Sequence, residues 1–145
     1  MIIKLELFGA SKDFSKNDFI EFNFTEKSSI KDLKGKIINY IEENYPQTAK
    51  EFQRIQFEQY LLFCRKQMDY GPSNIAMGTA LKTKEDRRLS LIGLIVRIND
   101  KIQRLMNLVV KHNRDAQNEP VMDAFKDLSV YGIIAQIVDN GKWGK

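Results

Sequence analysis

Apolar and polar residues alternate in two short segments near the N-terminus of the chain. The alternating apolar residues are Ile3, Leu5 and Leu7 in the first segment and Ile20, Phe22 and Phe24 in the second. A period of two is typical of β-strands with one buried face, and the polar stretch between the segments indicates a turn. A helix is expected next, because Ser29 stands three residues before Asp32 in a variant of the capping box and Pro46 marks the end. Residues 1–46 therefore predict a β-hairpin followed by one helix.

From Thr48 onward the spacing of apolar residues changes to that of helices. We expect helices over 49–69, 90–112 and 120–139. Residues 73–88 have no apolar periodicity and predict a loop, of a length that is usually functional or mobile. The predicted fold class is therefore α+β, mainly α, with a hairpin-and-helix appendage over 1–46 and a helical bundle over 47–145.

Charge is distributed unevenly along the 145 residues, whose formal net charge is +4. Up to Gln47 there are seven Lys and Arg against eight Asp and Glu, and from Thr48 onward there are sixteen against eleven. The positive excess of the second part suits an anionic ligand, but it is too thinly clustered to argue for duplex nucleic acid. No run approaches eighteen apolar residues and the N-terminus does not resemble a signal peptide. We expect a cytoplasmic protein without a membrane partner.

The expected helix over 90–112 is mostly apolar and yet carries a narrow cationic stripe. At 100° per residue, Arg97, Lys101 and Arg104 fall within a wedge of about 60°, with Asp100 on its edge. Such side chains can donate to phosphate oxygens. The alternative is a solvent-facing stripe with local ion pairs, which is common on amphipathic helices.

The last expected helix has two acidic residues on one face. Asp123 and Asp127 are four residues apart, and Tyr131 continues the same face toward apolar residues. Carboxylates that point into the protein need partners, which are either the cations of the preceding helix or a divalent metal such as Mg²⁺. An Asp–Arg network that merely ties two helices together is the structural alternative.

These segments together resemble a known family. They read RKQMDYGPSN, GLIVRINDKIQRLMNL and NEPVMDAFKDLSVYGIIAQIV, followed by GKW. The combination resembles the phage-associated nucleotide-modification-associated domain, first type, over roughly residues 52–143. The motif positions are Lys66, Asp69, Tyr70, Gly71, Arg97, Asp100, Lys101, Arg104, Leu105, Asp123, Asp127, Leu128 and Tyr131. The resemblance implies kinship with the all-α nucleoside-triphosphate pyrophosphatases of the MazG type, which are helical oligomers that bind Mg²⁺ through clustered carboxylates.

The N-terminal third resembles the first half of the β-grasp sulfur-carrier proteins of molybdopterin and thiamine synthesis. The matching stretches are LELFGASKDF, SSIKDL and NYP. Those carriers end in Gly-Gly, whereas this chain ends in GKWGK. The resemblance therefore implies the hairpin-plus-helix shape and no carrier role.

The chain departs from the pyrophosphatases because it places three cations where they have acids. This favours holding a phosphate over cutting it, so we expect a phage-type protein that binds a phosphorylated nucleotide from the DNA-precursor pool or a host signalling pathway and can sequester it without turnover. The expected ligand-binding residues are Lys66, Asp69, Tyr70, Arg97, Lys101, Arg104 and Tyr131, with either tyrosine stacking on a base. Asp100, Asp123 and Asp127 would order the cations or bind Mg²⁺.

Two alternatives stay open at this point. The first is an Mg²⁺-dependent pyrophosphohydrolase of the MazG type, in which the same three aspartates would be catalytic. The second is a structural or protein-interaction module that uses the edge of the hairpin for docking. In either case a homodimer or higher homo-oligomer is expected, since the helix over 90–112 is apolar over most of its circumference.

Overall fold

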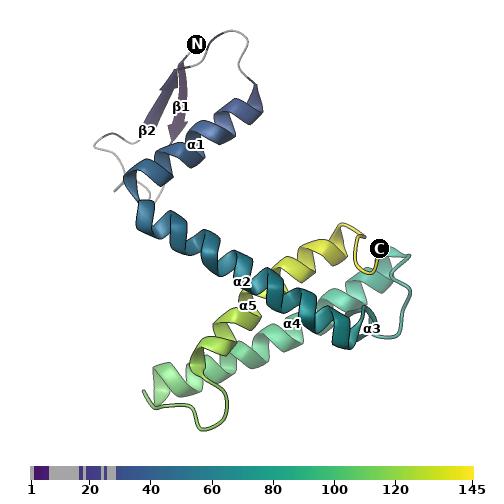
Figure 1. Cartoon of the computed structure of the whole chain (residues 1–145). Coiled ribbons are helices and arrows are strands. Elements are labelled where there is room, and N and C mark those ends of the chain that lie inside the picture. Colours follow the sequence, from purple (N-terminus) through teal and green to yellow (C-terminus); the bar gives the residue numbers. More distant parts are fainter. Residues whose placement is uncertain (1, 7–16, 18, 24, 26–28) are drawn as a thin grey trace. The chain divides into compact units, whose positions relative to one another are not determined.

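The computed structural model describes residues 2–6, 17, 19–23, 25 and 29–145 of the chain. The chain divides into two compact units, Met1–Ile55 and Gln56–Lys145 (Figure 1). It is mainly helical with one small antiparallel sheet, which confirms the predicted α+β, mainly α class. The division between the units lies within one long helix, α2 (Pro46–Tyr70), nine residues beyond the boundary expected from the sequence.

The first unit contains a hairpin and a helix. Strands β1 (Ile2–Glu6) and β2 (Phe19–Asn23) pair antiparallel, with Ile2 opposite Asn23 and Glu6 opposite Phe19. Helix α1 (Ile30–Asn44) begins with the expected capping box, in which the Asp32 amide donates to Ser29 Oγ and the Ser29 amide donates to the Asp32 carboxylate. The Phe22 ring meets the Tyr40 ring edge-on at 6.4 Å, so β2 packs on α1. Leu7 and Phe24 lie outside the described residues.

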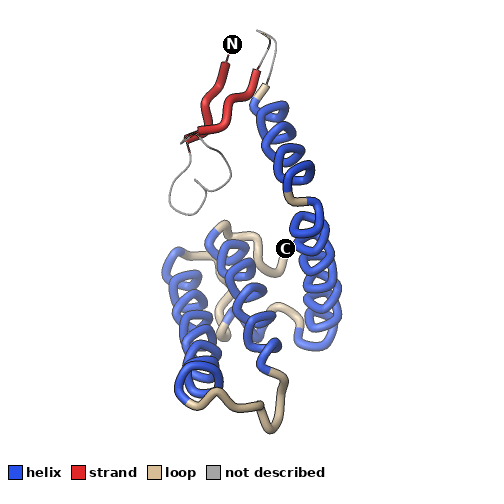
Figure 2. Tube along the Cα trace, turned by 90° about the vertical axis from the view of Figure 1, so that its left-hand side faces the viewer, coloured by secondary structure: helices blue, strands red, loops and turns tan. Residues whose placement is uncertain are grey.

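The second unit is helical and holds the main apolar core. Its elements are the end of α2, α3 (Ser73–Ala76), α4 (Lys84–Leu105), a π-helical turn η2 (Met106–Lys111) and α5 (Val121–Asp139). Helices α4 and α5 pack side by side (Figure 2). The core between them includes Leu94, Ile134 and Val138, and it extends to Ile75 and to Trp143 near the C-terminus. Within the described residues, no helix combines the length and the apolar character needed to cross a membrane.

The prediction of a loop over 73–88 is wrong at both ends. Ser73 begins the short helix α3, and α4 begins at Lys84 instead of near Ser90. The reason is a second capping box, in which the Asp86 amide donates to Thr83 Oγ1 at 3.0 Å and the Thr83 amide donates to the Asp86 carboxylate at 3.3 Å. The charged first turn of α4 therefore has no apolar periodicity but is stabilised by its cap.

The segment between α3 and α4 is held against α4 by close contacts. Ser90 is buried and its hydroxyl donates to the Ile75 carbonyl at 2.6 Å. A Cβ added at Gly93 would lie 2.3 Å from the Met77 sulfur, so the absence of a side chain there admits this segment. These contacts fix α3 beside α4 and so determine the position of Asn74, which is a residue of α3.

Candidate ligand-binding pocket

A concave pocket of about 350 Å³ opens in the second unit. It is lined by the last turns of α2, by α3, by the middle of α5, by one residue of α4 and by Trp143. Five residues expected from the sequence line it together: Lys66, Tyr70, Arg97, Asp127 and Tyr131. Residues more than sixty positions apart in the chain are thus gathered at one site.

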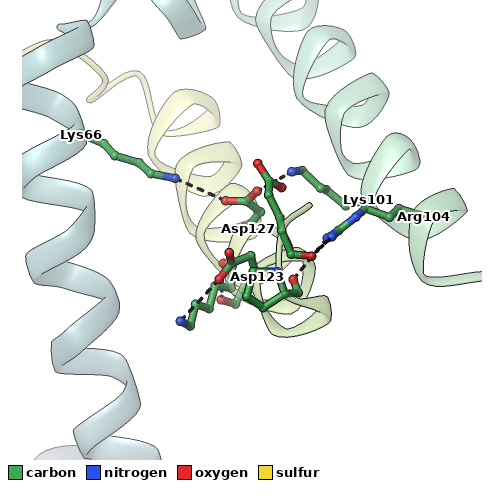
Figure 3. Close-up of polar contacts among 9 residues, drawn as sticks. Lys66, Lys101, Arg104, Asp123 and Asp127 are labelled. Atoms are coloured by element: carbon green, nitrogen blue, oxygen red, sulfur yellow. Dashed lines mark hydrogen bonds and ion pairs between the residues drawn. The ribbon is translucent and has the colours of Figure 1, made fainter. Parts of the chain in front are cut away.

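Asp127 is the centre of the ion pairs at this pocket. Its carboxylate lies 2.7 Å from the Lys101 ammonium and 3.5 Å from the Lys66 ammonium (Figure 3). The Asp127 and Lys101 side chains are 20% and 24% exposed, whereas Lys66 is 53% exposed. The hydrogen bond from Lys101 to Asp127 raises the pKa of Lys101 above its usual value. Lys101 is therefore held firmly outside the pocket lining, and Lys66 is held weakly at its rim.

Arg97 projects from α4 to the wall of the pocket. Its Nη2 donates to the Asn74 backbone carbonyl at 2.9 Å, which uses one of the five guanidinium N–H groups. It forms no ion pair with any carboxylate in the described part of the chain. A half-buried guanidinium with its remaining donors at a concave surface is suited to an anionic ligand.

Asn74 adds a second polar group to the same wall. Its side-chain Oδ1 is buried, and no donor among the described residues reaches it. A buried acceptor without a donor costs about 1–3 kcal/mol, so a water or a ligand N–H group is needed there. The sequence could not single out Asn74, because it was assigned to a loop and its burial depends on how α3 packs.

Lys126 is the third cation of the pocket lining, and sequence reasoning missed it. Its ammonium lies 3.6 Å from the Asp123 carboxylate, one helical turn away on α5. Both side chains are more than 40% exposed, so this pair is weak and Lys126 can turn toward a ligand. Its spacing from Asp123 was the only available signal, and such i,i+3 pairs are too common on helices to indicate a site.

Four aromatic rings line the pocket, from Phe63, Tyr70, Tyr131 and Trp143. Trp143 is buried, its indole N–H donates to the Pro72 carbonyl at 2.9 Å, and its ring lies edge-on to Phe63 at 6.1 Å. Trp143 therefore anchors the C-terminal residues to Pro72 and Phe63. Tyr131 is half-buried and Tyr70 is 64% exposed, so both rings are accessible to a ligand.

Other expected site residues lie elsewhere. Arg104 donates to the backbone carbonyls of Glu119 and, at 3.4 Å, Pro120, and so holds the segment that leads into α5 (Figure 3). Asp69 and Asp100 are exposed and do not line the pocket. The three cations on α4 thus bind three different partners. Of the three, only Arg97 lines the pocket.

The carboxylates expected to bind Mg²⁺ do not form a metal-binding group. Across residues 2–6, 17, 19–23, 25 and 29–145, no three His, Cys, Asp or Glu side chains are close enough together to hold an ion. Asp123 pairs with Lys126, Asp127 pairs with two lysines, and Asp100 is exposed. The described residues therefore do not form a cluster of three carboxylates that could hold an ion by itself, and the expected Mg²⁺ site stays a prediction.

Comparisons with known proteins add no relative. No family model, no curated protein and no solved structure matches the chain. The expected kinship with the nucleotide-modification-associated domain rests on the motif residues alone and stays a prediction. The geometry of the pocket is therefore the basis for a functional proposal.

Proposed function

We propose that this pocket binds a phosphorylated nucleotide and that the protein holds its ligand without turnover. The observation that carries the proposal is Arg97, which lines a pocket with aromatic walls and whose guanidinium has no carboxylate partner among the described residues. A volume of about 350 Å³ lies within the range of roughly 300–1,000 Å³ that is usual for small-molecule sites. Three cations line the pocket against the single carboxylate of Asp127, so an anion is favoured over a cation or a neutral ligand.

The phosphate end of the ligand would bind to the three cations of the pocket lining, Arg97, Lys66 and Lys126. Arg97 offers a planar fork of donors, which matches two phosphate oxygens at once. Lys66 and Lys126 are about half exposed and are held only by contacts of 3.5 and 3.6 Å, so a phosphate can draw both inward at low cost. Lys101 keeps the Asp127 charge compensated and so reduces its repulsion of the phosphate.

The base end of the ligand would stack on the accessible aromatic rings of the pocket. Tyr131 and Tyr70 stand on α5 and at the end of α2, and either ring offers a face for stacking. The Oδ1 of Asn74 is buried without a donor among the described residues, and it could accept an N–H group of the base once the Asn74 side chain turns toward the ligand; inorganic phosphate carries no such group. Stacking plus one polar contact to the base would make the site prefer nucleotides over inorganic phosphate.

Binding without hydrolysis is supported by the carboxylates. Asp127 is the one acidic residue in the described pocket lining, and two lysines already neutralise it. Enzymes that cleave a phosphoanhydride with metal ions commonly gather several carboxylates at one point, and no cluster of three stands among the described residues. Together with the family resemblance, this favours a phage-encoded protein that sequesters a DNA-precursor or signalling nucleotide in the cytoplasm of the host.

A thermal-shift screen of the purified full chain tests the proposal. Nucleoside mono-, di- and triphosphates, cyclic dinucleotides, free nucleosides and inorganic phosphate would be compared with and without Mg²⁺. A ligand present at a hundred times its dissociation constant stabilises by about 2.7 kcal/mol, which raises the melting temperature by about 5–10 °C for a chain of this size. Phosphorylated nucleotides should give this shift without Mg²⁺, and nucleosides should not. The proposal fails if no phosphorylated nucleotide shifts the transition, or if a triphosphate is converted to monophosphate and pyrophosphate when Mg²⁺ is added.

A further inference from the structure

Gln67 is a polar residue of the pocket lining that carries no charge. It lies on α2, four residues after Phe63 and three before Tyr70, and both of these aromatic residues line the same pocket. Residues at these spacings share one face of a helix. Gln67 is half-buried, and its carboxamide makes no hydrogen bond within the described part of the chain. The two N–H groups and the oxygen of this carboxamide are therefore left for water or a ligand.

The backbone at Gln67 is held by the way α2 ends. Gly71 adopts a left-handed conformation with a φ of 60°, and its amide donates to the Gln67 carbonyl at 2.9 Å. The carbonyl of the following residue, Pro72, accepts a hydrogen bond at 2.9 Å from the buried Trp143 indole. The last turn of α2 is thus anchored at its end. A side chain on such a rigid element can discriminate between similar ligands.

The chemistry of Gln67 differs from that of the cations around it. Lys66, Arg97 and Lys126 are donors only, whereas a carboxamide places an acceptor beside a donor. The oxygens of a fully ionised phosphate only accept, so the Gln67 carbonyl oxygen would find no partner on a phosphate. One edge of a nucleobase can satisfy both halves of a carboxamide at once. Gln67 is therefore suited to the base end of a ligand.

We infer that Gln67 contacts the edge of the bound nucleobase and makes the pocket prefer adenine. The inference rests on the proposed function, because it requires a nucleotide whose phosphate lies on the cations. Side chains three residues apart on a helix have Cβ atoms about 5–6 Å apart. A base stacked on the Tyr70 ring is therefore within reach of the Gln67 carboxamide.

Adenine fits a carboxamide better than the other bases do. It places its N6 amino group beside a ring nitrogen acceptor on both of its edges, so a carboxamide can form two bonds with either edge. Guanine offers two acceptors on the edge that carries N7, and it mixes donors and acceptors only on its pairing edge. Cytosine and thymine likewise match a carboxamide on one edge alone. An uncharged donor–acceptor pair at this position therefore favours adenine.

Isothermal titration calorimetry on the full chain gives the first arm of the test. Its probes are adenosine 5′-monophosphate, guanosine 5′-monophosphate and ribose 5-phosphate, which lacks a base. A bidentate contact to a base discriminates by about five- to a hundredfold, so the parent should prefer the adenine nucleotide by this factor. Gln67→Met keeps the length and helix propensity of the side chain but removes its donor and its acceptor. It should lose this preference and still bind ribose 5-phosphate like the parent.

Gln56→Met is the matched control for this arm. Gln56 is exposed on the same helix and does not line the pocket, so its variant should bind all three probes like the parent. Unchanged affinity of Gln67→Met for ribose 5-phosphate shows that the phosphate end of the pocket is intact in that variant. A weaker grip on the adenine nucleotide then reports the contact to the base and not a loss of folding.

Gln67→Glu gives a second arm, in which the preference should reverse. A carboxylate only accepts, and guanine carries two adjacent N–H groups on its pairing edge. The added negative charge weakens the binding of both nucleotides alike through their common phosphate, so the ratio of the two affinities isolates the base. That ratio should move toward guanine by about tenfold or more relative to the parent.

The outcomes separate this inference from the proposed function. A parent that binds the two nucleotides equally, a Gln67→Met variant that keeps the preference for adenine, or a Gln67→Glu variant with the ratio of the parent overturns the inference. In each of these cases nucleotide binding itself stands. A parent that binds neither nucleotide nor ribose 5-phosphate, and that no phosphorylated nucleotide stabilises in the thermal-shift screen, overturns the proposed function and this inference with it.

Discussion

Replacing Lys101 with Met removes the cation that lies closest to the Asp127 carboxylate. The two charged groups are 2.7 Å apart, and their side chains are 24% and 20% exposed. Fully exposed pairs are worth about 0–1 kcal/mol, and breaking a fully buried pair costs about 3–5 kcal/mol. A pair with about a fifth of its surface exposed should fall between these limits. We therefore expect Lys101→Met to lower the free energy of unfolding by about 1–3 kcal/mol.

The pH dependence of this effect follows from the raised pKa of Lys101. Its hydrogen bond to Asp127 is the main cause of the rise from the usual 10.5. A lysine whose folded pKa exceeds its unfolded pKa stabilises the fold fully below the unfolded value, and this stabilisation is lost as pH rises through the folded value. The difference between the parent and Lys101→Met should thus be constant between pH 7 and about 10 and should shrink above about pH 10.5.

Urea unfolding followed by circular dichroism, at one fixed protein concentration, measures these free energies. A cycle of Lys101→Met, Asp127→Asn and the double variant should give a coupling of about 1–2 kcal/mol. Lys66→Met is the matched control, because Lys66 contacts the same carboxylate at 3.5 Å but is 53% exposed and should cost less than about 1 kcal/mol. Additive effects in the cycle, or a Lys101→Met variant as stable as the parent, would refute the assignment of Asp127 as the centre of the pocket's ion pairs.

Three further predictions concern residues that support the pocket. Arg104→Ala should lower the free energy of unfolding by about 1–2 kcal/mol, because it loses bonds to the carbonyls before α5, and calorimetry should find nucleotide affinity unchanged within threefold. Thr83→Ala should cost about 1 kcal/mol in urea unfolding through loss of the α4 cap, and an unaltered midpoint would contradict the capping box. Trp143→Ala should cost about 3–5 kcal/mol, seen as a large drop in melting temperature, because a buried ring that also bonds Pro72 is removed.

Much of the fold follows from local patterns in the sequence. The alternation around Ile3 and Phe22 predicts both strands, and the Ser29 capping box predicts the start of α1. The start of α4 was missed because its first turn is charged throughout, so its only signal is the spacing of Thr83 and Asp86. Apolar periodicity reports which residues are buried, and a capped first turn that lies in solvent leaves no trace in it.

The candidate site was predicted in part, for a geometric reason. A helical wheel gives the direction of a side chain but not its position along the axis. Arg97 and Arg104 share a wedge, yet seven residues separate them by about 10.5 Å, so each meets a different neighbour. Arg97 reaches α3 and the pocket, whereas Arg104 reaches the segment before α5. The placement of Asn74 depends on tertiary packing alone, and no pattern of residues could have indicated it.

Isothermal titration calorimetry of Arg97→Ala tests the central claim most directly. The nucleotide that stabilises the parent most in the thermal-shift screen would be titrated into the parent, Arg97→Ala and Arg65→Ala. Arg65 is exposed on α2 outside the pocket lining, so its variant removes the same charge without touching the site. Loss of a charge-assisted bond to phosphate costs about 1.5–3 kcal/mol, so Arg97→Ala should bind about ten- to a hundredfold more weakly, while Arg65→Ala should match the parent. Equal affinity of Arg97→Ala and the parent would contradict the account.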